Sequence, residues 1–348
     1  MGNPVDETDK LEAFNIYVNS MATLPVDLRE YIQKEIEAPR KVWSPAATNL
    51  YRNQPSARNA NERSGIDILA DDLLFRDEVH GGEDHICRVA EAYLRTAHLP
   101  TAPSALVEKQ HGKVLTQPIA DTAIGYISSK DSKDRAVAPL TRKEELVITP
   151  DALVSMIHFP FLTCQWKSAT GTGGTMSHAQ NQSARDGTAI VNYLHDFYTR
   201  AAHEPSAVDT CHWSVTCDMH SAMLWVHWRN FNKEEQIVEH HMTLVDQQFL
   251  RSAKDVNNKA MEGFRSQLRN ILNWALGQRL HNLKAAIPQY EVNEAKKLKR
   301  AIPAAARKAS QQTSNQGRGS NSRALSEESS PQSSKRPKIG STNQQQLD

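Results

Sequence analysis

Apolar and polar residues recur along this chain in two periods, which predict a mixture of strands and helices. Residues 159–167 combine apolar, aromatic and β-branched side chains, with a proline near the start of the segment and a glycine-rich turn after it, which predicts a short buried strand. Because side chains alternate along a strand, Thr163, Gln165 and Lys167 should share one face, opposite an apolar face. A buried lysine is costly without a partner, so this strand should end at a cleft or against a charged group.

The remaining apolar patterns predict helices on both sides of a sheet. Further strands are expected at residues 114–127, 210–219, 222–230 and 236–244, the last three as an antiparallel meander. Helical spacing of apolar residues predicts helices at 25–36, 63–75, 84–99, 177–200 and 257–285, and Thr149, Pro150 and Asp151 have the order of a helix start leading to about residue 157. The fold class is therefore predicted as α/β (α+β), a mixed central sheet flanked by helices.

The composition changes at both ends of the chain. Residues 1–60 mix polar residues with prolines and are interpreted as a partly disordered arm, and 61–290 as the α/β domain. Residues 291–348 are basic and rich in Ser and Gln, too poor in apolar residues to offset the entropy of ordering, so a disordered tail is expected. Its basic clusters at 296–300 and 335–338 are read either as nuclear import signals or as a solvated basic helix end.

Charge and cysteine content indicate the cellular location of the protein but do not identify a binding partner. Lys and Arg number 41 against 40 Asp and Glu, so there is no overall polyelectrolyte character. The 4 cysteines are irregularly spaced, no charged apolar leader precedes them, and no apolar run approaches the roughly 20 residues of a membrane span. These features predict an intracellular protein, nuclear or otherwise cytoplasmic, with no membrane association.

One arrangement of polar residues suggests chemistry. Asp121 lies on one predicted strand, Gln165 and Lys167 lie on another, and a helix follows. Carboxylates in such a layout can hold a divalent cation that activates water for phosphodiester hydrolysis, while a lysine orients the water or neutralises developing charge.

The segments 118–126, 160–167 and Asn181-Gln182, which opens a helix, resemble the PD-(D/E)xK, or restriction-endonuclease-like, superfamily. More closely, they resemble an uncharacterised fungal family with such a core. The resemblance implies that Asp121 is a metal-binding acid, Gln165 stands at the second acid position, Lys167 is the catalytic lysine, and Gln182 lines the site. It also implies Mg²⁺ as cofactor and nucleic acid, DNA or RNA, as partner.

Gln165 departs from the family pattern, because a carboxamide offers a cation a neutral oxygen where an acid would offer a charge. The leading hypothesis is a nucleic-acid-binding protein whose metal-dependent phosphodiesterase activity is weakened or lost. The first alternative is an active nuclease in which another acid substitutes, with Asp151, Glu91 and Asp186 as candidates; Asp151 is otherwise an ordinary helix N-terminal residue. The second alternative is a non-enzymatic interaction scaffold.

Overall fold

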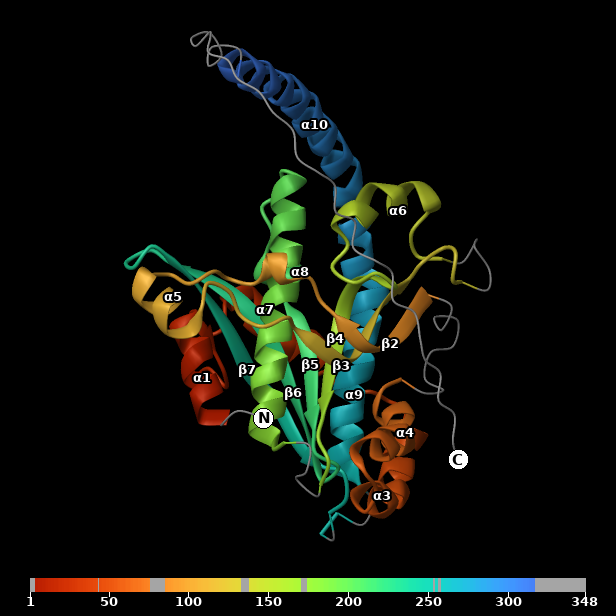
Figure 1. Cartoon of the computed structure of the whole chain (residues 1–348). Coiled ribbons are helices and arrows are strands. Elements are labelled where there is room, and N and C mark those ends of the chain that lie inside the picture. The colour runs from red at the N-terminus through yellow and green to blue at the C-terminus, as the bar shows by residue number, and fades with distance from the viewer. Residues whose placement is uncertain are drawn as a thin grey trace, which may run out of the picture. The chain divides into compact units, whose positions relative to one another are not determined.

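The computed structural model describes residues 4–42, 44–75, 85–132, 138–169, 174–252, 254–255 and 258–316, with the backbone alone at 45 and 301–316. A first compact unit comprises residues 1–296, and a second begins at Lys297. The first unit holds a mixed sheet whose strand order is β1-β7-β6-β5-β4-β3-β2 (Figure 1). The strands are β1 Ile16–Tyr17, β2 Ile86–Tyr93, β3 Ile119–Ile127, β4 Ile157–Trp166, β5 His212–Cys217, β6 Ser221–Asn232 and β7 Ile237–Phe249.

Helix α7, Met176–Arg200, is the crossover that the sheet topology requires. Strands β4 and β5 are parallel, and parallel neighbours need a long connection, whereas β2, β3 and β4 pair antiparallel, as do β5, β6 and β7. The other α-helices are α1 Pro4–Ala13, α2 Val26–Tyr31, α3 Pro45–Arg58, α4 Glu62–Leu73, α5 Ala105–His111, α6 Arg142–Ile148, α8 Ala207–Thr210, α9 Lys259–Trp274 and α10 Leu280–Gln316. The 3-10 turns are Thr96–His98 and Thr149–Asp151, and the π-helical turns are Ile32–Ile36 and Ala275–Arg279.

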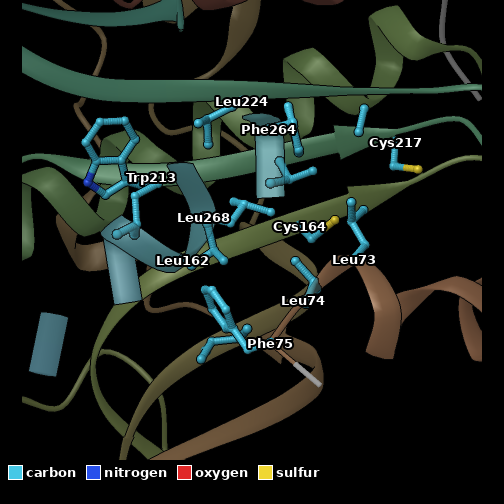
Figure 2. Close-up of a cluster of buried hydrophobic side chains, with 14 of the residues drawn as sticks. Leu73, Leu74, Phe75, Leu162, Cys164, Trp213, Cys217, Leu224, Phe264 and Leu268 are labelled. Atoms are coloured by element: carbon cyan, nitrogen blue, oxygen red, sulfur yellow. The ribbon is translucent and has the colours of Figure 1, made fainter. Parts of the chain in front are cut away.

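Two apolar cores lie on the two faces of the sheet. Helix α9 and the end of α4 cover one face, where apolar side chains from β4, β5 and β6 meet theirs (Figure 2). Helix α7 lies over the other face (Figure 1). Side chains from α1 and from the start of α10 belong to the same core as those of α7. The predicted class of a mixed sheet with flanking helices is thus confirmed, because β4 is buried along its whole length and needs cover on both faces.

Two predicted helices were wrong. Residues 84–99 were expected to be helical, but their core is strand β2, followed by a 3-10 turn. Its buried positions Val89 and Ala92 are three residues apart, as on a helix, because Glu91 has φ of 49° and interrupts the alternation of the strand. The helix expected from Thr149 to about residue 157 is only the 3-10 turn Thr149–Asp151, and α6, with its Thr141 capping box, lies just before it.

The described part of residues 1–60, a segment interpreted as a partly disordered arm, contains α1, β1, α2, a π-helical turn and α3, which ends at Arg58. Leu11 and Phe14 are buried in the core under α7, and Leu28, Ile36 and Leu50 in the core under α9. Apolar residues spaced among prolines and polar residues thus suffice for docking onto a sheet. In the tail, α10 continues to Gln316, and the later residues lie outside the described part of the chain.

Buried histidines lie on the strands beneath α7, and His240 of β7 also contacts that helix. The ring of His227 shares a hydrogen bond of 2.7 Å with Ser214 Oγ, and His240 Nε2 lies 2.9 Å from Asn192 Oδ1. Desolvation lowers the pKa of each of these two histidines to about 3. Both rings are therefore neutral in the folded protein at neutral pH.

We predict that these histidines make the protein less stable in mild acid. Below about pH 6.5 these histidines become protonated in the unfolded chain but stay neutral in the folded protein. Each one therefore lowers the free energy of unfolding by about 1.4 kcal/mol for every unit by which the pH falls, until the pH nears 3. The raised pKa of Asp186 acts in the opposite direction, so the comparison is between variants. Between pH 7.5 and 5.5, urea unfolding of His240→Asn should show a smaller loss of stability than the parent, by about 1.4 kcal/mol, whereas exposed His203→Asn should match the parent. Equal losses in the parent and His240→Asn would contradict the prediction.

At Gly187, α7 lies directly against the sheet. A Cβ placed there would overlap the His227 ring, whereas a Cβ at Gly263 of α9 meets no atom within 4 Å. We therefore expect Gly187→Ala to destabilise the protein by about 1–3 kcal/mol through overpacking. Gly263→Ala, the matched control, should be neutral or stabilise by up to about 1 kcal/mol through helix propensity. Thermal unfolding checks both, and a neutral Gly187→Ala would show that α7 can move away from β6.

Candidate active site

Strands β3 and β4 bring Asp121 and Lys167 together. In the antiparallel register Thr122 lies opposite Cys164, so Asp121 reaches the end of β4. Its Oδ2 accepts a hydrogen bond of 2.8 Å from the backbone N–H of Trp166 and lies 3.8 Å from Lys167 Nζ. Lys167 is buried, its ammonium donates to the carbonyl of Trp166 at 2.8 Å, and its backbone N–H is held by the carbonyl of Cys217.

Desolvation raises the pKa of Asp121, although Lys167 and the Trp166 N–H oppose the shift. The charged partner that the sequence led us to expect for Lys167 is therefore Asp121. A carboxylate whose pKa is perturbed by desolvation, beside a charged partner, marks a candidate functional site.

Gln165 contacts a carboxylate from α7. Its Nε2 donates to the carbonyl of Ile119 at 2.9 Å and to Asp186 Oδ2 at 2.5 Å. Asp186 is fully buried, and desolvation raises its pKa to about 7, against the opposing charge of Arg185 and the hydrogen bond from Gln165. Of the acids considered as substitutes for position 165, Asp186 is the one whose side chain contacts Gln165.

Three buried side-chain oxygens of this group accept no hydrogen bond within the described residues. They are Asp186 Oδ1, Gln165 Oε1 and Gln182 Oε1. Gln182 lies one turn before Asp186 on the same side of α7, and its assignment to the site lining stays a prediction. Unpaired acceptors with no donor are costly in a protein interior, and a cation would satisfy them.

Glu62 is an acid of the site that the sequence did not reveal. It is the first residue of α4, and its pKa is raised by desolvation and by Asp121 but lowered by Lys167 and by a hydrogen bond from the Ser168 backbone. An acid in the first turn behind an Asn N-cap is an ordinary helix start, so nothing in the sequence marked Glu62 as functional. Only the packing of α4 against the end of β4 brings Glu62 near Lys167.

Glu91 and Asp151, the two other acids named from the sequence, are placed differently. Glu91 lies across from Asp121 on β2, where its charge raises the pKa of Asp121 and its positive φ strains the strand next to the site. Asp151 does not line the site. It lies on the 3-10 turn before the start of β4, the end opposite Gln165, and is bound by Arg200 and the hydroxyl of Tyr290, each at 2.7 Å.

A cleft of about 370 Å³ opens beside Asp121, between α4 and strands β2 and β3. Two arginines line it, and both are paired with acids of α4: Arg88 with Asp71 at 2.6 Å and Arg63 with Asp67 at 3.7 Å. The cleft wall is therefore of mixed charge, and its arginines could exchange these partners for an anionic ligand.

The donor set fits a divalent cation in type. Carboxylate and amide oxygens are the ligands that Mg²⁺ prefers, and Asp121, Asp186 and Gln165 supply them around one lysine. Within the described ranges no three His, Cys, Asp or Glu side chains are arranged as a ready-made metal site. A cation here would thus rest on two acids and an amide oxygen, and water ligands would complete its coordination.

The fold and site define an α+β domain in which a cleft of mixed charge lies beside buried charged groups at one end of the sheet. The chain belongs to the family described as "Domain of unknown function (DUF7924)", which matches residues 18–287. That span includes residues 18–60, so the segment interpreted as an arm is largely part of the family domain. A comparison with curated proteins finds no match. Across the residues described, no helix has both the length and the apolar character to cross a membrane.

We predict that Gln165→Glu turns this cluster into a cation-dependent one. The substitution removes the amide donor to Asp186 and to the Ile119 carbonyl and places two carboxylates in contact, which should cost about 1–3 kcal/mol at pH 8. The penalty should shrink at pH 5.5, where a proton can be shared, and should also shrink on addition of Mg²⁺. Exposed Gln289→Glu carries the same charge change and should show neither effect. Chemical unfolding with and without Mg²⁺ measures all three proteins; an unchanged Gln165→Glu would mean that Asp186 does not contact this side chain in solution.

Proposed function

We propose that this protein is a metal-dependent phosphodiesterase acting on nucleic acid, in which Asp186 supplies the carboxylate that position 165 lacks. The observation that carries the proposal is the hydrogen bond between Gln165 and Asp186 beside the Asp121 and Lys167 pair. An acid that has moved from the strand to the following helix keeps the negative charge of the site while its side chain reaches the same place. The proposal therefore favours the active alternative over the weakened one.

The order of elements supports the same reading. A strand carries Asp121, the next carries Gln165 and Lys167, helix α7 carries Gln182 and Asp186, and a parallel strand, β5, follows. The strand with Asp121, the strand with Gln165 and Lys167 and the helix with Gln182 follow the order implied by the resemblance to the PD-(D/E)xK superfamily. We extend the proposal to a nuclear location, on the basic clusters at 296–300 and 335–338.

Each residue has a role in this proposal. Asp121, Asp186 and the oxygen of Gln165 would hold Mg²⁺, which when bound polarises a phosphate and lowers the pKa of water. Lys167 places its ammonium beside Asp121, where it neutralises charge that develops on the phosphate. Lys167 and Asp186 are buried, whereas the carboxylate of Asp121 is partly exposed at the cleft, and the low solvation of the first two strengthens these interactions.

Cleavage of labelled single-stranded and duplex DNA and RNA by the full chain tests the proposal, in Mg²⁺ or Mn²⁺ and with EDTA. We expect metal-dependent cleavage that falls by roughly 10²-fold or more in each of Asp121→Asn, Lys167→Ala and Asp186→Asn. Lys233→Ala, in the turn between β6 and β7, is the matched control and should retain the parent rate.

The other outcomes separate the alternatives. Full cleavage by Asp186→Asn, with loss in the other two variants, would show that a different acid, such as Glu62, completes the site. Cleavage by Gln165→Glu alone would identify a disarmed site, and nucleic-acid binding would then be the function to measure. Absence of cleavage and of binding in all forms would leave the scaffold alternative.

A further inference from the structure

A second and larger cleft, of about 480 Å³, lies beside α6, and it shares no lining residue with the cleft at Asp121. It is formed by the end of β2, the turn after β3, helix α6 and the start of β4. Its volume is in the range of pockets that bind small molecules. Neither the candidate active site nor the proposed function uses it.

Positive charge dominates this cleft. Arg95, Lys130 and Arg142 line it and are exposed, and none of the three has an ion-pair partner within the described residues. The Arg95 guanidinium donates to the carbonyl of Pro150 at 2.9 Å, a neutral acceptor that leaves its charge uncompensated. Guanidinium and ammonium groups gathered in this way favour an anion.

The carboxylate of the cleft is already engaged. Glu145 is buried, and it accepts hydrogen bonds from both the backbone N–H and the hydroxyl of Ser129, each at 2.5 Å. It therefore cannot neutralise the cations at the rim by moving toward them without breaking these bonds. The excess of positive charge is thus built into the cleft.

His158 gives the cleft a polar group that is only partly satisfied. Its side chain is about nine-tenths buried and its Nε2 lies 3.4 Å from Glu145 Oε1, while Nδ1 has no hydrogen-bond partner within the described residues. Burial lowers the pKa of this histidine, so the neutral ring offers one donor and one acceptor. A ligand in the cleft would satisfy a group that is otherwise costly.

Apolar and aromatic surface accompanies the charges. Tyr93 and Leu146, 57% and 66% exposed, line the cleft, as does Leu153. An exposed aromatic ring provides a stacking surface for a planar ligand. The cleft therefore joins a cationic rim, one buried histidine and an aromatic wall.

We propose that this cleft binds an organic phosphate of the size of a nucleoside monophosphate, with its phosphate toward Arg95, Lys130 and Arg142 and its ring against Tyr93. Such a ligand matches both halves of the lining, whereas inorganic phosphate would use the cations alone and a nucleoside the apolar wall alone. The inference does not depend on the nuclease proposal.

Calorimetric titration of the full chain with AMP, adenosine and inorganic phosphate, without divalent metal, tests the inference. AMP should bind at least tenfold more tightly than either fragment. Arg142→Gln should weaken AMP binding by roughly tenfold, the loss of one charge-assisted contact. Lys143→Gln, the neighbour on α6 that does not line the cleft, should bind as the parent does. Lys130→Gln provides a second variant at an exposed position should Arg142→Gln fail to fold.

Lys167→Ala distinguishes this cleft from the candidate active site and should leave AMP binding unchanged. Loss of AMP binding in Lys167→Ala but not in Arg142→Gln or Lys130→Gln would place the nucleotide at Asp121 and overturn the inference. Equal affinity for AMP and adenosine, or no binding of AMP, would overturn it as well. These results are independent of whether the protein cleaves nucleic acid.

Discussion

Strand β4 is buried along all ten of its residues, and the rest of the first unit is arranged so that this burial is possible. A central strand normally excludes proline, because proline cannot donate to a neighbouring strand, yet Pro160 lies within β4. Phe159 next to it has φ of 44°, and the register with β3 shifts nearby. The buried guanidinium of Arg279 donates to the carbonyls of Phe159 and Pro160, at 3.1 and 3.2 Å, and so compensates for the interrupted ladder. The π-helical turn between α9 and α10 is what brings Arg279 to this place.

The opposite end of β4 has the reverse problem, an excess of buried charge. Lys167, Asp121 and Asp186 are held there with little solvent, and each depends on the others for compensation. Asp121 comes from β3, Asp186 from α7 on one face of the sheet, and Glu62 from α4 on the other face. Elements of all three layers therefore meet at this end of β4. Removal of one of these charges leaves the others uncompensated and should destabilise the protein, whereas a charged ligand can take part in their compensation.

Much of the fold could be predicted from local pattern. The alternation of side chains around Gln165 and the helical spacing of apolar residues in 177–200 are clear signals, because β4 and α7 are long and pack on well-defined faces. Strand β2 was missed because Glu91 breaks its alternation and leaves Val89 and Ala92 at a helical spacing. The ordered structure within residues 1–60 was not predicted, because the burial of its apolar side chains depends on contacts with strands and helices far away in the sequence.

The sequence by itself determined which side chains of β4 share a face, and therefore that Gln165 and Lys167 open together toward one site. It also offered Asp121 on the preceding strand, since acids near strand ends can be read from periodicity. Only the tertiary structure decided that Asp186, rather than Asp151, meets Gln165, and that Glu62 approaches Lys167. These contacts join residues on separate elements, and their geometry is set by the crossover of α7 and the packing of α4, which no local pattern encodes.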